Sequence, residues 1–96
     1  MPLVPEIWAM KKPPTLADTI RAKLDGGRLP REDHIKLWAG YGRNRPCIAC
    51  EQTILATQVE HELEFEDGRI VSMHIACAGL YEAERRRRGW SRGQRP

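Results

Sequence analysis

The chain contains no long hydrophobic run. Nowhere in its 96 residues do roughly 18 apolar side chains follow one another, the length that indicates a membrane-spanning helix. Its first residues, Met-Pro-Leu-Val-Pro-Glu, also lack the basic and apolar regions of a secretory signal peptide. We therefore expect a cytoplasmic protein that has no membrane partner.

Cysteine is scarce as well, with three residues in the whole chain. An odd number of cysteines without export signals argues against a disulfide scaffold, because cytosolic thiols stay reduced. A chain of 96 residues buries only a modest core, so a bound metal would add stability that the core lacks. With 41% hydrophobic and 30% charged residues, the composition is typical of one small soluble domain.

The cysteines fall into two short pairs, Cys-Ile-Ala-Cys at 47–50 and His-Ile-Ala-Cys at 74–77. A two-residue spacer lets both side chains of a pair bind one tetrahedral ion. Three thiolates and one imidazole select zinc over calcium, magnesium or manganese, with iron as a substitute during expression. The predicted zinc ligands are Cys47, Cys50, His74 and Cys77. Because four protein ligands leave no open position, the expected role of the zinc is structural.

Between the two pairs, the sequence predicts a β-hairpin. Residues 58–66 alternate apolar side chains or His61 with glutamates, which is the period of a half-buried strand. Asp67-Gly68 favours a two-residue turn, and residues 69–73 become the returning strand. This turn predicts a register in which His61 lies opposite His74.

The predicted register brings His61 next to one of the zinc ligands. From there it can exchange with His74 as a ligand or form a hydrogen bond to it. We favour a third interpretation, in which His61 is a half-buried strand residue without a metal role.

A helix is predicted after the second pair, from Ile75 or Ala76 to about Arg88. Its glutamates precede arginines by four residues, which favours ion pairs along a helix, and Gly89 ends it. Cys77 then lies in the first turn, where the helix dipole favours a thiolate.

Prolines, glycines and the ligand pairs set the predicted boundaries along the chain. Residues 1–14 form a flexible arm with four prolines, in which Trp8 can dock on the domain or on a partner. Residues 15–46 form a helical part that packs on the zinc module. Residues 47–88 are the zinc-binding module, and residues 89–96 are a basic flexible tail.

The helical part is predicted to contain one or two short helices. Thr15 and Asp18 form a capping pattern, and apolar residues at helical spacing follow over about 16–25. A second, weaker helical stretch begins at Leu29-Pro30. Its apolar surface comes from Ile35, Leu37 and Trp38.

The order of a cysteine knuckle, a hairpin and a helix that supplies the last two ligands resembles a treble-clef zinc finger. The spacing Cys-x2-Cys-x23-His-x2-Cys resembles the first zinc half of LIM domains, over residues 47 to about 88. The resemblance implies a small α+β, zinc-stabilised fold in which the four ligands are structural. A LIM domain continues into a second zinc half, whereas this chain continues into Glu82 and arginines, so LIM partner binding is not transferred. The chain also looks like small uncharacterised bacterial proteins with this ligand pattern, a likeness that implies no function.

Charge is distributed unevenly along the chain. Residues 47–79 carry six acids against one arginine, whereas residues 80–96 carry six arginines against two glutamates. Arginine suits phosphate because its planar fork donates two hydrogen bonds, and a tryptophan can stack on a base. We predict electrostatic binding of DNA or RNA, with little sequence specificity. The residues expected to carry it are Arg85, Arg86, Arg87, Arg88, Trp90, Arg92 and Arg95.

Protein binding is the alternative function. The hairpin edge, the acidic strand face or the Trp8 arm can each dock on another protein. We expect a monomer, although the separation of charge also permits the basic tail of one chain to bind the acidic hairpin of another.

Catalysis is not expected. Nucleophilic chemistry would need a free thiolate, and all three thiols are assigned to the metal. Glu62, Glu64 and Glu66 lie on one strand face as paired carboxylates, but exposed strand glutamates explain the pattern better.

Overall fold

The structure is a computed structural model that describes residues 14–90 of the chain. Residues 1–13 and 91–96 lie outside the described residues, and with them nearly all of the predicted arm and most of the predicted tail. The elements are α2 (Leu16–Asp25), β1 (Lys36–Tyr41), β2 (Arg45–Pro46), β3 (Thr53–Ile54), β4 (Val59–Glu64), β5 (Ile70–His74) and α3 (Ile75–Arg87). The predicted α+β class is confirmed. None of the helices within residues 14–90 is long and apolar enough to span a membrane.

Helix α2 forms where the sequence predicts a helix. The Thr15 hydroxyl accepts a hydrogen bond from the Asp18 N–H at 3.1 Å, and the Asp18 carboxylate accepts one from the Thr15 N–H at 3.0 Å. These two bonds satisfy donors that a helix start leaves free. Ile20 and Leu24 are fully buried in the core, so one face of α2 is fixed against the rest of the domain.

The second predicted helix is wrong. Residues 36–41 form strand β1 instead, which pairs antiparallel with β4 and places Leu37 opposite Leu63. Apolar residues spaced by two and three positions fit either period in so short a segment, and pairing with β4 decides between them. The preceding segment is nevertheless held in place, because the buried Tyr81 hydroxyl donates a hydrogen bond of 2.7 Å to the Pro30 carbonyl.

The hairpin between β4 and β5 forms, but its predicted register is wrong by one residue. The structure places Glu60, not His61, opposite His74. The turn has three residues, closed by hydrogen bonds of 2.9 Å from the Phe65 N–H to the Arg69 carbonyl and from the Gly68 N–H to the Phe65 carbonyl. Gly68 alone in the turn has a positive φ, of 92°, as in a type I turn followed by a glycine bulge.

This shift of one residue decides which side chains share a face of the sheet. Strand order is β1-β4-β5, and the face that we call the inner face carries the buried side chains of Leu63, Val71 and Met73. The opposite, outer face carries the row Trp38, Glu62 and Ser72 and the row Gly40, Glu60 and His74. The buried apolar side chains of β4 and β5 therefore gather on the inner face, and the glutamates of β4 lie on the other.

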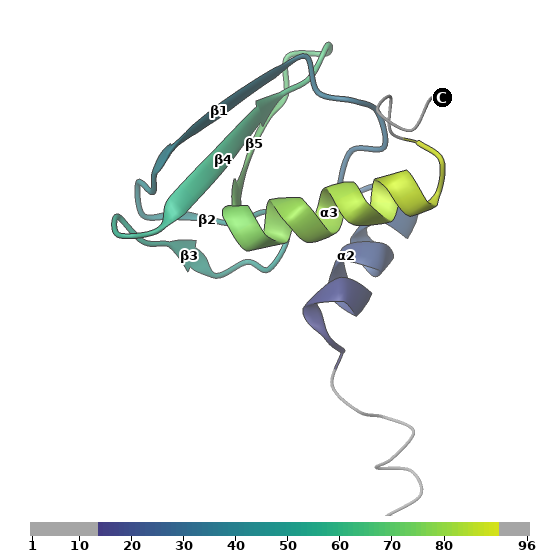
Figure 1. Ribbon diagram of the computed structural model, residues 1–96, viewed down its shortest axis with the longest axis horizontal. Helices are drawn as coiled ribbons and strands as arrows, with labels where there is room; N and C mark the ends of the chain where they lie inside the picture. The colour runs from purple at the N-terminus through teal and green to yellow at the C-terminus, as the bar shows by residue number, and fades with distance from the viewer. Residues whose placement is uncertain (1–13, 91–96) are drawn as a thin grey trace, which may run out of the picture.

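Helix α3 follows β5 without a linker, as predicted. Cys77, Ala78 and Tyr81 face the core together with the inner face of the sheet. In Figure 1, α3 lies between the sheet above it and α2 below it. The start of α3 is therefore tied to the end of β5, which positions His74 and Cys77 relative to each other.

A miniature hairpin of β2 and β3 carries the first cysteine pair. It leaves the sheet after β1 at Gly42, whose N–H donates to the Gln58 carbonyl at 2.8 Å. Gly42 is tightly enclosed: a Cβ there would lie 2.3 Å from the Leu55 carbonyl oxygen and 2.7 Å from that of Ile54. Only glycine lets these two backbone segments approach so closely.

We predict that Gly42→Ala lowers the free energy of unfolding by about 2 kcal/mol or more, because the added methyl group overlaps backbone atoms that cannot move aside. Urea unfolding in a zinc-containing buffer measures the change. Gly79→Ala is the matched control, since a Cβ at this α3 position meets no atom within 4 Å. It should be neutral or stabilise by up to about 1 kcal/mol. Equal stability of the two variants would contradict the packing described for Gly42.

Candidate metal centre

The four predicted ligands come together in the structure. The ligand atoms of Cys47, Cys50, His74 and Cys77 all lie within 4.8 Å of one another. They come from three elements: the cysteine pair between β2 and β3, the last residue of β5, and the first turn of α3. The cluster can hold a metal ion, and it brings the cysteine pair at 47–50 next to the junction of β5 and α3.

Backbone hydrogen bonds shape the cysteine knuckle at 47–50. The Glu51 N–H donates to the Cys47 carbonyl at 2.8 Å, and the Cys47 N–H donates to the Gln52 carbonyl at 2.9 Å. Glu51 adopts a positive φ of 68° to close this turn. The Ile48 N–H donates to the Ser72 carbonyl of β5 at 3.0 Å, so the knuckle is attached directly to the strand that ends in His74.

A second support for the knuckle comes from α2. The buried Lys23 ammonium donates to the Ile48 carbonyl at 2.8 Å and pairs with the Glu51 carboxylate at 2.7 Å. The hydrogen bond from Lys23 and its positive charge hold the pKa of Glu51 below its ordinary value. Sequence reasoning missed Lys23, because nothing in a single helix indicates a contact with a loop 25 residues away.

The ring of His74 is oriented for metal binding through Nδ1. Its Nε2 lies 3.2 Å from the Thr53 carbonyl oxygen, which can only accept a hydrogen bond, so Nε2 carries the proton. Nδ1 is then free, and it lies 3.4 Å from the Cys50 Sγ and 3.8 Å from the Cys77 Sγ. A histidine ligand is commonly fixed in this way by a carbonyl on its other nitrogen.

The thiols differ in how easily they ionise. Burial alone would raise the pKa of the Cys47 thiol, but backbone N–H groups of Cys50, His74 and Ala49 lower it to about 7. For Cys77, burial and the nearby Cys47 and Cys50 sulfurs together raise the pKa well above its ordinary value. Three thiolates this close together would repel one another without a cation, and a divalent ion would remove that repulsion.

The distances fit a tetrahedral ion. Metal–sulfur bonds of about 2.3 Å and metal–nitrogen bonds of about 2.0 Å place sulfur and nitrogen roughly 3.5 Å apart, close to the 3.4 and 3.8 Å found around His74 Nδ1. Three sulfurs and one imidazole are also the donor set of structural zinc sites. The residues present therefore fit a metal ion with no open coordination position.

His61 does not belong to this cluster. The structure pairs it with Ala39 and Met73 on the inner face of the sheet, whereas His74 lies in the neighbouring row on the outer face. The predicted pairing of His61 with His74 is wrong because the register differs by one residue. Such a shift places the two side chains on opposite faces of the sheet.

Three of the four described arginines that were predicted to bind nucleic acid have acidic partners inside the protein. Arg85 is 1% exposed, and its guanidinium donates to the Arg31 carbonyl at 3.0 Å, to Asp33 at 2.6 Å and to Glu82 at 2.8 Å. Burial alone would lower the pKa of Arg85, but the hydrogen bond to Asp33 and the charge of Glu82 raise it. In this position Arg85 links α3 to the segment before β1 and is not accessible to a nucleic acid.

Arg87 and Arg88 share Glu84 as a partner. The Glu84 carboxylate accepts hydrogen bonds from Arg87 at 2.6 Å and from Arg88 at 2.7 Å, which hold its pKa at about 2. Arg88 also pairs with Asp25 at 2.8 Å, so it joins the end of α3 to the end of α2. Its guanidinium is therefore largely engaged within the fold.

Trp90 also packs within the protein. Its ring contacts the hydrophobic core, and the guanidinium carbons of Arg31 and Arg88 lie 4.3 and 5.0 Å from its centroid. Arg86 and Arg87 remain exposed. Arg92 and Arg95 lie outside the described residues. The predicted interface thus keeps two exposed arginines within residues 14–90.

The glutamates considered as paired carboxylates, Glu62, Glu64 and Glu66, do not form one exposed face. Glu62 is half-buried and paired with Arg43 and Arg45, Glu64 is half-buried, and Glu66 lies in the turn after β4. Glu60, on the same face of β4, is buried. The prediction of an exposed acidic strand face is therefore wrong for the part of β4 next to β2. Ion pairs from the segment that leads to the knuckle cover it.

The chain was compared with protein-family models, curated proteins and solved structures, and none of them matches it. The geometry of the site therefore carries the functional argument alone.

We predict that Cys77→Ala loses the bound metal, whereas His61→Ala retains one ion per chain. The first change removes one of four ligands from the cluster, and the second removes a side chain on the opposite face of the sheet. Metal content after dialysis, measured by plasma mass spectrometry, checks both variants. Metal loss from His61→Ala with an intact fold would show that the ligand assignment is wrong.

Arg85→Ala should destabilise the fold by about 3 kcal/mol, because it removes a buried guanidinium together with its hydrogen bonds to Asp33, Glu82 and the Arg31 carbonyl. Arg86→Ala, one residue along the same helix and exposed, should change stability by less than about 0.5 kcal/mol. Thermal unfolding of both variants at equal zinc concentration measures the difference. Equal stability of the two variants would disprove the internal role of Arg85.

Proposed function

We propose that this chain is a structural-zinc module of the treble-clef type that binds another protein along the edge of its sheet. Zinc is proposed because the cluster supplies three thiolates and one imidazole at distances that suit a tetrahedral ion. A cytoplasmic, reducing environment would keep these thiols available. Because four protein ligands fill the coordination sphere, the zinc has a structural and not a catalytic role.

The treble-clef assignment is supported by the order of the elements around the cluster. A knuckle supplies Cys47 and Cys50, a hairpin of β4 and β5 follows, and the end of β5 with the first turn of α3 supplies His74 and Cys77. This is the order in which the first zinc half of LIM domains provides its ligands. Strand β1 and helix α2 are additions to that arrangement.

The observation that carries the proposed protein binding is the exposure of β1. It lies at the end of the strand order β1-β4-β5. The backbone groups on the edge of β1 that points away from β4 therefore have no strand partner among the described residues. Leu37, Trp38 and Tyr41 are 48%, 45% and 75% exposed, and Lys36 is the only charged residue in the strand. Natural proteins usually protect such an edge with charges, prolines or a covering segment.

An exposed, apolar edge strand is suited to β-augmentation, in which an extended segment of a partner adds a strand to the sheet. The charge of the outer face does not oppose such a partner, since Arg43 and Arg45 neutralise Glu62 there. The partner is a different polypeptide or a second copy of this chain, and the crosslinking experiment below distinguishes them by mass.

Nucleic-acid binding is the second candidate. It is favoured by the exposure of Arg86 and Arg87 at the end of α3, and by two further arginines that follow in the sequence at positions 92 and 95. The contacts would be electrostatic and would weaken steeply with added salt. The internal partners of Arg85 and Arg88 make this surface smaller than the sequence alone predicts.

Site-specific photocrosslinking tests the two functions against each other. We predict that the chain with Tyr41 replaced by p-benzoylphenylalanine crosslinks in cells to a discrete polypeptide, because position 41 is an exposed aromatic on β1. The same replacement of Arg86, an exposed residue near the end of α3, is the matched control. Digestion with nuclease before electrophoresis should leave the product at position 41 unchanged.

The opposite outcome is equally informative. A nuclease-sensitive product at position 86, lost at high salt and without any product at position 41, would favour nucleic-acid binding over the proposed protein binding.

A further inference from the structure

A small pocket on the outer face of the sheet contains a buried carboxylate with a free oxygen. Glu60 is 3% exposed, and its Oε1 has no hydrogen-bond partner in the described part of the chain. Its other oxygen lies 3.5 Å from an Arg45 nitrogen, at the limit of a hydrogen bond. A buried carboxylate oxygen without a donor is costly, so a group that supplies a donor here would be bound favourably.

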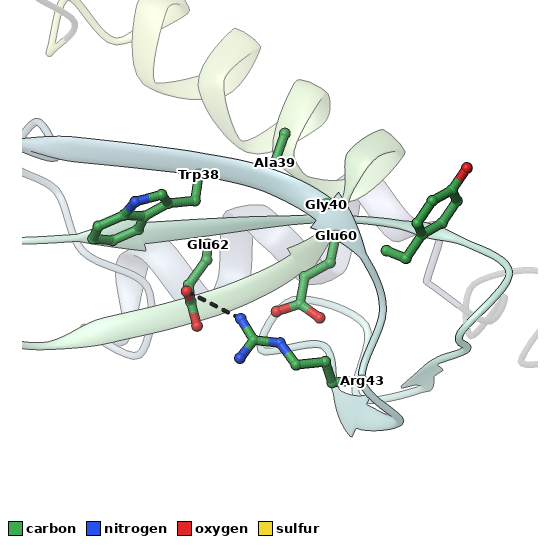
Figure 2. A pocket seen from close by; sticks show the side chains of 7 residues that line it. Trp38, Ala39, Gly40, Arg43, Glu60 and Glu62 are labelled. Atoms are coloured by element: carbon green, nitrogen blue, oxygen red, sulfur yellow. Dashed lines mark hydrogen bonds and ion pairs between the residues drawn. The ribbon is translucent and has the colours of Figure 1, made fainter.

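The pocket exists because Gly40 has no side chain. Gly40 lies directly opposite Glu60 in the pairing of β1 with β4, and a Cβ at Gly40 would meet no atom within 4 Å. The resulting cavity has a volume of about 70 Å³ and is bounded by Trp38, Gly40, Arg43, Glu60 and Glu62. Figure 2 shows both carboxylates on the same side of the sheet, with the Trp38 ring near Glu62.

The neighbouring groups restrict what can bind. Both oxygens of Glu62 are already paired, one with Arg43 at 3.3 Å and the other with Arg45 at 3.0 Å, so the open acceptor is Glu60. An anion would face the Glu60 carboxylate in a small space, while the arginines nearby are already paired with Glu62. A ligand must therefore be small, donate hydrogen bonds, and carry either no charge or a positive charge.

Trp38 adds a preference for positive charge. An indole ring attracts a cation over its face, and the Lys36 ammonium already lies 5.9 Å from the centre of the Trp38 ring. The ring is thus accessible to an ammonium group at the surface. An ammonium carries three donors and no acceptor, which matches the unpaired oxygen of Glu60.

We propose that the Glu60 pocket binds a primary ammonium group, with Glu60 as its hydrogen-bond acceptor and the Trp38 ring as an adjoining wall. Two sources of this group are compatible with the pocket: a free alkylamine, or the lysine side chain of a peptide that lies along β1. Four consecutive residues of β1, 38–41, line the cavity, so a strand added to β1 would pass beside it. The lysine source rests on the function proposed above, and the ammonium site itself does not.

The first experiment is an NMR titration of the zinc-loaded, 15N-labelled protein with n-butylammonium chloride. The indole N–H signal of Trp38, assigned with Trp38→Phe, should shift in a saturable way with a Kd on the order of 1–10 mM. Equal concentrations of n-butanol and of sodium chloride are controls for the alkyl chain and for ionic strength. Neither should reproduce the saturable shift.

Three variants locate the effect. Glu60→Gln should weaken butylammonium binding at least tenfold, and Gly40→Leu should abolish it by filling the cavity. Glu64→Gln, a glutamate of the same strand and face that does not line the pocket, should bind as the wild type does. Zinc content and the remaining amide signals show that each variant is folded, so that a loss of binding is assigned to the pocket.

A second titration separates the two sources. A short acetylated and amidated peptide, Val-Thr-Lys-Thr-Val, is compared with the same peptide carrying norleucine in place of lysine. Tighter binding of the lysine peptide than of butylammonium, by tenfold or more and with shifts along the β1 amides, identifies a lysine in an added strand. Equal affinity of the two ammonium probes identifies a free amine as the ligand.

The proposal is overturned if the shifts do not saturate, or if Glu60→Gln and wild type respond alike. In that case the pocket holds only solvent. This outcome differs from a failure of the proposed protein binding, since crosslinking at Tyr41 does not depend on an ammonium group and butylammonium binding does not depend on a partner.

Discussion

The convergence of three thiols and one imidazole is the interaction on which this fold depends. A chain of 96 residues has a small core, and its sheet, its knuckle and its last helix meet at the four ligand atoms. Without a cation, burial and then the nearby Cys47 and Cys50 sulfurs oppose ionisation of Cys77 and raise its pKa. A divalent ion would turn that repulsion into an attraction that joins three elements, and its binding would then be coupled to folding.

Local signals in the sequence were sufficient for the parts of the structure that are locally determined. The Thr15–Asp18 capping box and the spacing of the ligand pairs each involve residues three positions apart, and both formed as predicted. Strand β1 was mistaken for a helix because its partner lies some 20 residues further along the chain. The predicted hairpin register is wrong because the turn contains one residue more than predicted, and Asp67-Gly68 fits both a two-residue and a three-residue turn.

Charged residues illustrate the same limit from another side. The sequence alone does not show whether the side chains in a run of four arginines are solvated or paired within the protein. In the structure Arg85 is buried, Arg88 joins two helices, and Arg87 shares its partner Glu84 with Arg88. What separates them is the position of acids on other elements, such as Asp33 and Asp25. The alternation of glutamates in β4 was equally ambiguous, because the arginines that cover Glu62 belong to the segment before the knuckle. Partners that are distant in sequence determine whether a charge acts within the fold or at its surface.

The knuckle lies inside the connection between two paired strands. Tyr41 and Val59, the residues that enter and leave this connection, are themselves partners in the sheet. Closing a loop whose ends are already held costs less conformational entropy than closing a free one. The pairing of β1 with β4 therefore lowers the entropy cost of bringing Cys47 and Cys50 next to His74 and Cys77. The affinity for a metal would accordingly include a contribution from strand pairing, and a change in β1 far from any ligand would alter how tightly an ion is held.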